Sequence, residues 1–248
     1  MSSFWKRFGS HFKYTSADVR RRGLGRWFQI LEDHFMLLFW ANLLFVGCAA
    51  PFLVCLFFFC QLGDLLSLAG MAVSLLLLGP GLTALSYVCM QLIRDKKVWL
   101  WEDFRDCVKR EWKQAAAFSL LVGLLWGMFV YALRLIIAIH GGLGPGYRLL
   151  FGLNSFLLIG VTIFGYQQIA MVQLPFYGVV KNAFLLIIAG KRHSFMAVLF
   201  ALLLVGVCLW FYEYVVFYLL LGLPALLILT SNLMFYPAFT DLFPEDDE

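Results

Sequence analysis

The side chains that could do chemistry in this sequence are few and scattered. Six cysteines and four histidines occur, but their spacing does not place three or four of them around one metal ion. The sequence contains no phosphate-binding loop and no G-x-S-x-G or H-E-x-x-H element. Its apolar runs hold no paired carboxylates that could serve as general acid and base. The expectation is therefore a protein without enzymatic activity, metal or cofactor.

Polar or helix-breaking residues inside the apolar runs are the remaining candidates for a ligand site. They are Asn42, Gly79, Pro80, Thr83, Asn154, Gln167 and Gln168. The Gly-Pro-Gly element at residues 79–81 either interrupts its helix, as at transporter binding sites, or only kinks it. The amides either contact a polar ligand or make hydrogen bonds between helices. The sequence leaves both interpretations open.

The segments that carry these side chains are long and apolar. Of the 248 residues, 62% are hydrophobic and 14% are charged, with a mean hydropathy of +0.85. Typical soluble domains are about half apolar and about a quarter charged. This composition excludes a typical soluble enzyme, a disordered chain and a nucleic-acid-binding module. The predicted fold is all-α, a polytopic membrane helix bundle of about six transmembrane helices.

Six runs are long enough to span the hydrocarbon core of a bilayer, which takes about 20 residues. They are expected at residues 35–60, 65–93, 115–139, 149–176, 195–211 and 215–236. A five-span arrangement with one long, bent final helix is the alternative. Pro51 and Pro224 are expected to kink the first and last spans. Residues 178–193 are too short to span and are expected at the membrane interface.

The positive charges predict the orientation of the bundle. Lys and Arg cluster between Lys6 and Arg26, between Arg94 and Lys113, and between Lys181 and Arg192. Six spans place these clusters and both termini on one side, which the positive-inside rule makes cytoplasmic. Residues 1–28 are then a basic cytoplasmic segment, either an amphipathic helix or a disordered tail. Residues 29–240 form the transmembrane domain, and residues 241–248 an acidic tail. The expected location is a membrane that the chain crosses several times, with the N-terminus on the cytoplasmic side.

Residues 99–114 are predicted to form an amphipathic helix lying along the cytoplasmic interface. Its large apolar residues recur at spacings of three and four, which places them on one helical stripe beside a charged face. The helix either rests on its own bundle and lipid or docks a partner. The candidate docking residues are Trp101, Phe104, Arg105, Lys109 and Trp112.

Three stretches resemble the YesL-like family of bacterial integral membrane proteins. They are W-x-N at Trp40 to Asn42, GPGLTALSYVCMQLIRDKK from Gly79 onward, and the following WEDF and KREWKQA. The resemblance is strongest over residues 27–118 and weaker over residues 173–200. It implies a polytopic protein without catalytic residues. Relatives tend to be encoded beside carbohydrate-uptake systems and glycoside-degrading enzymes in Gram-positive bacteria, an association rather than a physical argument.

Two functions remain. The leading expectation is a non-enzymatic accessory or scaffold subunit that contacts permease or ATPase subunits of an ATP-binding-cassette carbohydrate importer. The alternative is a transporter or channel that conducts a small polar solute, which requires a continuous polar cavity between the helices. The lipid bilayer is an expected partner in both cases and nucleic acid in neither, and the oligomeric state stays open.

Overall fold

The computed structural model describes residues 24–62, 65–142, 144–172, 174–189, 191–210, 219 and 222–242. These residues form seven helices and, within the described ranges, no strand, so the all-α prediction is confirmed. The helices are α2 (Leu24–Leu62), α3 (Leu65–Ile93), α4 (Leu100–His140), α5 (Pro145–Met171), α6 (Phe176–Ala189), α7 (Lys191–Trp210) and α9 (Leu223–Leu242). Most of the expected basic N-terminal segment and acidic tail lies outside the described residues.

Four helices, α2 to α5, are long and apolar enough to cross a bilayer. They correspond to the first four expected spans. Helices α6, α7 and α9 contain shorter apolar stretches, at Phe176–Ile188, Ser194–Val207 and Leu223–Tyr236. The expected fifth and sixth spans fall on α7 and α9, but residues 211–218 between them are outside the described ranges. The count of six spans and the side of the termini stay predictions.

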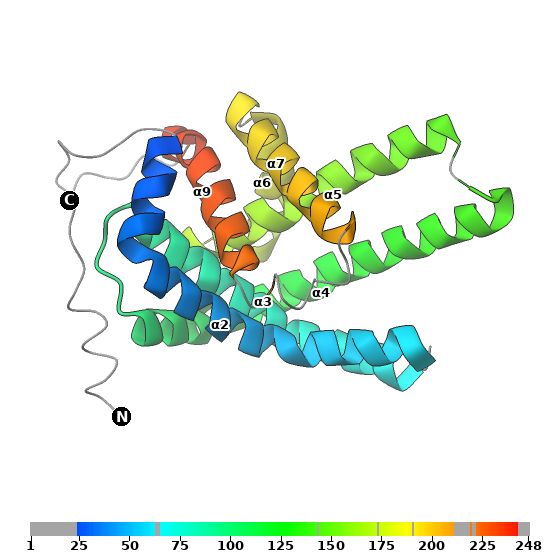
Figure 1. Cartoon of the computed structure of the whole chain (residues 1–248), viewed down its shortest axis with the longest axis horizontal. Helices are drawn as coiled ribbons and strands as arrows, with labels where there is room; N and C mark the ends of the chain where they lie inside the picture. The colour runs from blue at the N-terminus through cyan, green and yellow to red at the C-terminus, as the bar shows by residue number, and fades with distance from the viewer. Residues whose placement is uncertain are drawn as a thin grey trace.

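Helix α3 lies between α2 and α4 and packs along both (Figure 1). Helix α5 returns beside α4. Helix α6 packs against α5, α7 packs against α5 and α9, and α9 packs against α2 and α3. The far end of α4 and the start of α5 extend beyond the rest of the bundle at the right of Figure 1. The successive long helices run in opposite directions. The start of α2, the end of α3, the start of α4 and the end of α5 therefore meet at one end of the molecule.

The Gly-Pro-Gly element is a packing point at which α3 approaches both neighbours. A Cβ atom at Gly79 would lie 2.5 Å from the backbone oxygen of Ala115 in α4. A Cβ atom at Gly81 would lie 2.7 Å from the Cβ of Cys48 in α2. Helix α3 runs through Pro80 without interruption. The element is therefore not a helix break, and its small residues let three backbones come close together.

The backbone irregularities lie away from the two prolines that were expected to cause them. Pro51 lies inside α2, whose non-helical backbone angles occur at His34 instead (φ −129°, ψ 21°). Pro224 is the second residue of α9 and follows Gly222, which has a φ of +100°. A proline in the first turn of a helix lacks only an N–H that would have no partner inside the helix. Pro224 therefore begins a helix rather than kinking one.

Helix α4 joins the predicted interfacial segment and the third predicted span into one helix of 41 residues. At 1.5 Å per residue it is about 61 Å long. The prediction of a separate helix over residues 99–114 is wrong, because the junction around residues 114–117 has the sequence Gln-Ala-Ala-Ala, without a glycine or proline to end a helix. The amphipathic segment prolongs the spanning helix in the same direction.

Candidate functional site

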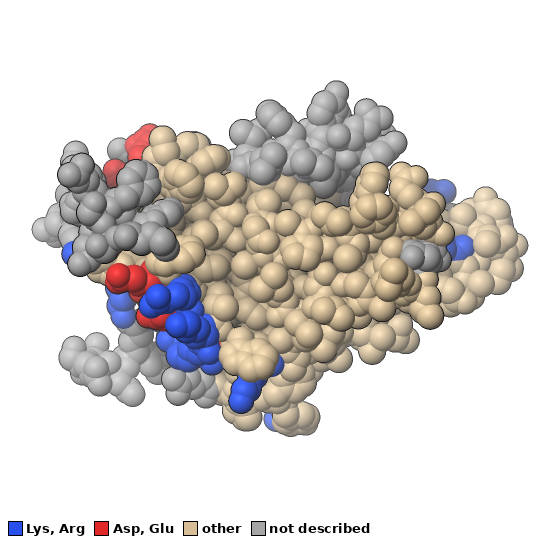
Figure 2. Space-filling view, turned by 90° about the horizontal axis from the view of Figure 1, so that it is seen from below, with Lys and Arg blue, Asp and Glu red and all other residues tan. Residues whose placement is uncertain are grey.

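The charged residues concentrate where the start of α2, the end of α3, the start of α4 and the end of α5 meet. We call this region the charged end. Figure 2 shows Lys and Arg, with some Asp and Glu, towards the left of the molecule and a broad middle region without them. Around the turn between α3 and α4, the exposed cations are Lys96, Lys97, Arg105, Lys109, Arg110 and Lys113. The flanks expose large apolar side chains such as Leu66, Leu124 and Leu149. This division is that of a bundle with lipid-facing sides and one polar end.

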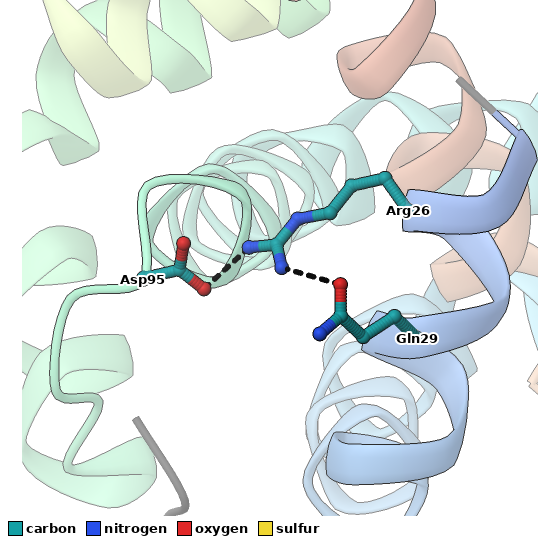
Figure 3. A network of polar contacts seen from close by, with 3 residues as sticks. All are labelled: Arg26, Gln29 and Asp95. Atoms are coloured by element: carbon teal, nitrogen blue, oxygen red, sulfur yellow. Dashed lines mark hydrogen bonds and ion pairs between the residues drawn. The ribbon is translucent and has the colours of Figure 1, made fainter. Parts of the chain in front are cut away.

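An ion pair between a buried arginine and a partly buried aspartate ties the start of α2 to the turn between α3 and α4 (Figure 3). The guanidinium of Arg26 donates to Oδ1 of Asp95 and, over 3.1 Å, to Oε1 of Gln29. Arg26 is only 5% exposed. Beside it, the indole N–H of Trp27 donates to the hydroxyl of Thr230 in α9, over 2.9 Å. The first turns of α2 are therefore held both to the turn between α3 and α4 and to α9.

Asp95 is also the backbone pivot of that turn. Its φ of +56° lies in the left-handed region, where a helix-ending glycine is usual and aspartate is one of the few tolerated alternatives. The N–H of Asp95 donates to the oxygen of Leu92 over 3.2 Å, and the N–H of Lys96 to the oxygen of Gln91 over 3.0 Å. These two bonds close the end of α3 as a Schellman motif. One residue thus ends α3 and holds the buried arginine.

Sequence reasoning missed this ion pair. It counted Arg26 only as one member of a basic cluster, and the partner lies far along the chain. The single acidic residue in the run Arg-Asp-Lys-Lys (residues 94–97) was the available signal, because a lone carboxylate among cations at a helix end is a candidate for a structural pair.

Four of the five predicted docking residues lie together on one exposed face of α4. Trp101, Arg105, Lys109 and Trp112 are exposed, and their spacings of four, four and three place them side by side on the helix. We call this set the α4 face. The fifth residue, Phe104, is 6% exposed and belongs to the hydrophobic core. It packs inward and is unavailable to a partner.

Asn42, the first of the predicted intramembrane polar residues, secures the backbone before α9. Its side chain is fully buried. Its Nδ2 donates to the oxygen of Leu219 over 2.7 Å, and its Oδ1 accepts from the N–H of Ala225 over 3.3 Å. It therefore supplies hydrogen bonds to the backbone on both sides of the turn at Gly222.

The two glutamines act in different places. The Nε2 of Gln167 donates to Asn232 of α9, whose Nδ2 donates to the backbone oxygen of Ser86 in α3 over 3.2 Å. Gln168 donates to the oxygen of Phe164 in its own helix over 3.1 Å. Within the described part of the chain, the Oε1 atoms of both glutamines are buried and accept no hydrogen bond. Gln167, through Asn232, links α5, α9 and α3, and such bonding between helices is the commoner use of polar residues in membranes.

The predicted polar set does not converge on one site. Thr83 donates to the backbone oxygen of Gly79, one turn back in the same helix, over 3.0 Å. Asn154 is exposed and lies about 20 Å from Gln167 along the axis of α5. The structure thus brings Gln167 near α3 and α9, leaves Asn42 at the turn before α9, and places Asn154 on the outer surface.

A pocket of about 200 Å³ lies between the ends of α3, α4 and α5. We call it the arginine pocket. Its walls are formed by Tyr87, Gln91, Arg94, Arg110, Glu111 and residues 169–172. The guanidinium of Arg110 lies 5.6 Å from the ring centroid of Tyr87, and its Nε donates to Glu111 over 2.7 Å. None of the predicted intramembrane polar residues lines this pocket.

Comparison with known proteins relates the centre of this arrangement to a family. Residues 38–133 match a family described as "Protein of unknown function, DUF624". The matched segment begins in α2, includes all of α3 and ends in α4, and it covers less than half of the chain. It contains the Gly-Pro-Gly packing point, Asp95 and the α4 face. No curated protein and no solved structure matches the chain.

Proposed function

We propose that this protein is a non-enzymatic membrane scaffold that holds a cytoplasmic partner at its charged end. The observation that carries the proposal is the α4 face. Two large indoles, Trp101 at 38% and Trp112 at 52% exposed, flank two cationic side chains there. Tryptophan and arginine are the residues that most often dominate the binding energy of protein interfaces.

The length of α4 supports a position outside the hydrocarbon core. About 20 of its 41 residues suffice to cross the core. The remaining turns, about 30 Å of helix, extend beyond it. All charged residues of α4 except Arg134 lie in its amphipathic start, so this is the end that projects. A projecting helix presents its outer face to whatever protein lies against that side of the membrane.

The mixture of charges favours a protein over lipid as the occupant of the α4 face. Glu102 and Asp106 are exposed next to Arg105 and Lys109 on the same helical segment. A helix that binds anionic lipid is usually rich in lysine and arginine on its polar face. Carboxylates at the same level repel anionic headgroups, whereas they can pair with cations of a protein partner.

The start of α4 is held in place on several sides, which lowers the entropic cost of docking. The carboxylate of Asp103 accepts from the N–H of Trp99 over 2.7 Å at the first turn. The amide of Gln114 donates to the oxygen of Leu174 after α5, over 2.8 Å. The ion pair between Arg26 and Asp95 fixes the preceding turn. The α4 face is therefore presented on a supported helix.

In this proposal the partner is a permease or ATPase subunit of an ATP-binding-cassette carbohydrate importer in a bacterial plasma membrane, and the N-terminus is cytoplasmic. The resemblance to the YesL-like family supports the identity of the partner, and the clustering of cations supports the orientation. Conduction of a small polar solute is the second candidate. The buried amide oxygens of Gln167 and Gln168 that lack a partner among the described residues favour it.

Affinity purification from native membranes tests the scaffold proposal. The full chain is expected to recover importer subunits, identified by mass spectrometry. Trp101→Ala with Trp112→Ala should reduce recovery by at least tenfold, since an interface tryptophan contributes about 2 kcal/mol or more. Leu124→Ala with Met128→Ala is the matched control, because both side chains are 62% exposed on the same helix but lie outside the charged end.

Two results would contradict the scaffold proposal. One is recovery of the protein alone under conditions that keep importers intact. The other is equal recovery of importer subunits by the double tryptophan variant and the control. Solute uptake into proteoliposomes containing only this chain would instead favour the conducting role, and Gln167→Leu should then abolish that uptake.

A further inference from the structure

We infer that the arginine pocket binds a phosphate ester that carries free hydroxyl groups, with the phosphoglycerol headgroup of an anionic lipid as its source. The inference does not depend on the proposed scaffold role. It rests on the side chains that meet in the pocket, on the position of the pocket along the helix bundle and on the volume of the pocket.

The phosphate-binding group is supplied chiefly by Arg110. Its Nε is engaged by Glu111 and its planar group lies over the ring of Tyr87. These contacts orient the guanidinium, and its two terminal nitrogens make no hydrogen bond to the described residues. Arg94 reaches the same pocket from the end of α3. Guanidinium groups bind phosphate through paired hydrogen bonds, which favours arginine over lysine at such sites.

Gln91 distinguishes a hydroxylated ester from phosphate alone. Its Oε1 is buried in the pocket wall and accepts no hydrogen bond from the described residues. A buried acceptor without a donor is costly. The phosphodiester group of a lipid headgroup offers only acceptors, so it cannot satisfy this atom. A hydroxyl on the bound ester can donate to Gln91, and a second hydroxyl can donate to Glu111, whose carboxylate is 13% exposed.

The position of the arginine pocket fits a lipid headgroup. It lies where α3 and α5 end and where the apolar flanks meet the charged end. Basic pockets between spanning helices at this level bind phosphorylated headgroups in other membrane proteins. The volume of about 200 Å³ equals roughly six or seven water-sized groups. That space accommodates a phosphoglycerol group, while the acyl chains remain outside against the apolar helix flanks.

The test is native mass spectrometry of the full chain after reconstitution with equal amounts of phosphatidylglycerol, phosphatidylethanolamine and phosphatidylcholine with identical acyl chains. The wild type is expected to retain one phosphatidylglycerol preferentially. Arg110→Gln should lower that occupancy about tenfold. Arg105→Gln is the matched control, because both side chains are half exposed on α4 and each pairs with the next carboxylate, but Arg105 does not line the pocket.

A second variant tests the hydroxyl contact. Gln91→Met keeps the size of the side chain and removes the acceptor. It should reduce the preference for phosphatidylglycerol over phosphatidic acid, which lacks the glycerol hydroxyls. Soluble glycerol phosphate at millimolar concentration identifies the source. If it binds the wild type but not Arg110→Gln, and no lipid is selected, the chemistry of the pocket stands and its ligand is a soluble ester.

Two outcomes would overturn the inference. Equal lipid occupancy in Arg110→Gln and Arg105→Gln refutes it, because only Arg110 lines the pocket. Absence of any preference among the three lipids, together with no binding of glycerol phosphate, does the same. Gel filtration of each variant confirms that it is folded before the lipids are counted.

Discussion

Replacing Asp95 by glycine separates the two things that this residue does. The variant removes the carboxylate opposite Arg26, which is only 5% exposed. Removing one partner of a buried pair costs about 3–5 kcal/mol, and the lower end applies here, because Arg26 keeps its bond to Gln29 and the Asp95 side chain is 19% exposed. The φ of +56° is less strained for glycine, which returns about 1 kcal/mol. The expected net loss is about 2 kcal/mol.

Thermal unfolding in detergent micelles, followed by tryptophan fluorescence, measures this loss. For a chain of this length 1 kcal/mol corresponds to about 2–4 °C, so Asp95→Gly should lower the Tm by about 4–8 °C. Trp27 lies beside the ion pair and reports on this region. The double variant Arg26→Met with Asp95→Gly removes both charges. It should unfold within about 1 kcal/mol of the wild type, because an apolar replacement of a buried pair is often nearly neutral.

The cycle of single and double variants isolates the interaction between the two side chains. Asp95→Asn should fall between the wild type and Asp95→Gly, since asparagine tolerates the left-handed backbone and still offers an oxygen to Arg26. A Tm for Asp95→Gly at or above that of the wild type, with no coupling in the cycle, would refute this account of the charged end.

Three further predictions concern the packing and hydrogen bonding of the helices, and each is measured by the same thermal unfolding. Gly79→Ala should destabilise the protein by about 1–3 kcal/mol, because the added Cβ meets the backbone of α4. The control Gly127→Ala has open space around the added Cβ and should be neutral or stabilising. Equal effects of the two variants would contradict the role of Gly79 as a packing point. Asn42→Leu should cost about 1–3 kcal/mol through unmet backbone groups, and an unchanged Tm would argue against its role at the turn. Phe104→Ala should cost about 3–5 kcal/mol and Trp112→Ala less than 1 kcal/mol; the reverse order would mean that the wrong face of α4 is buried.

The helical architecture was predictable because hydrocarbon thickness and hydrogen bonding leave little choice. The second predicted span coincides with α3 at residues 65–93, since apolar length decides such a helix. The start of α4 was less accessible. Trp101 and Trp112 were grouped with Phe104 into one apolar stripe, but the side that packs on the bundle is centred on Phe104 and Cys107. A rotation of less than a quarter turn changes which large residues face a partner, and hydrophobicity alone does not resolve it.

The ion pair between Arg26 and Asp95 could not be predicted from the sequence, for a different reason. Arg26 lies in the first turn of α2, whereas Asp95 lies in the turn after α3, 69 residues further along the chain. Composition placed both residues at the membrane surface, where ion pairs contribute little. Burial converts the same pair into a structural link. The arginine pocket was missed likewise, because its side chains come from three helices whose ends coincide only in the folded chain.

The fate of the intramembrane polar residues bears on how such residues indicate function. Lipid is as apolar as a leucine side chain, so burial of apolar surface does not drive spanning helices together, and close packing and hydrogen bonds must. The side chain of Asn42 donates to the backbone oxygen of Leu219 and accepts from the backbone N–H of Ala225, both near the start of α9. Gln167 donates to Asn232, and its buried oxygen accepts no hydrogen bond from the described residues. A polar residue whose capacity is used within the protein holds the bundle together, and only unused capacity points to a ligand. By that criterion the arginine pocket, with Gln91 and Arg110, is a better candidate than the Gly-Pro-Gly element.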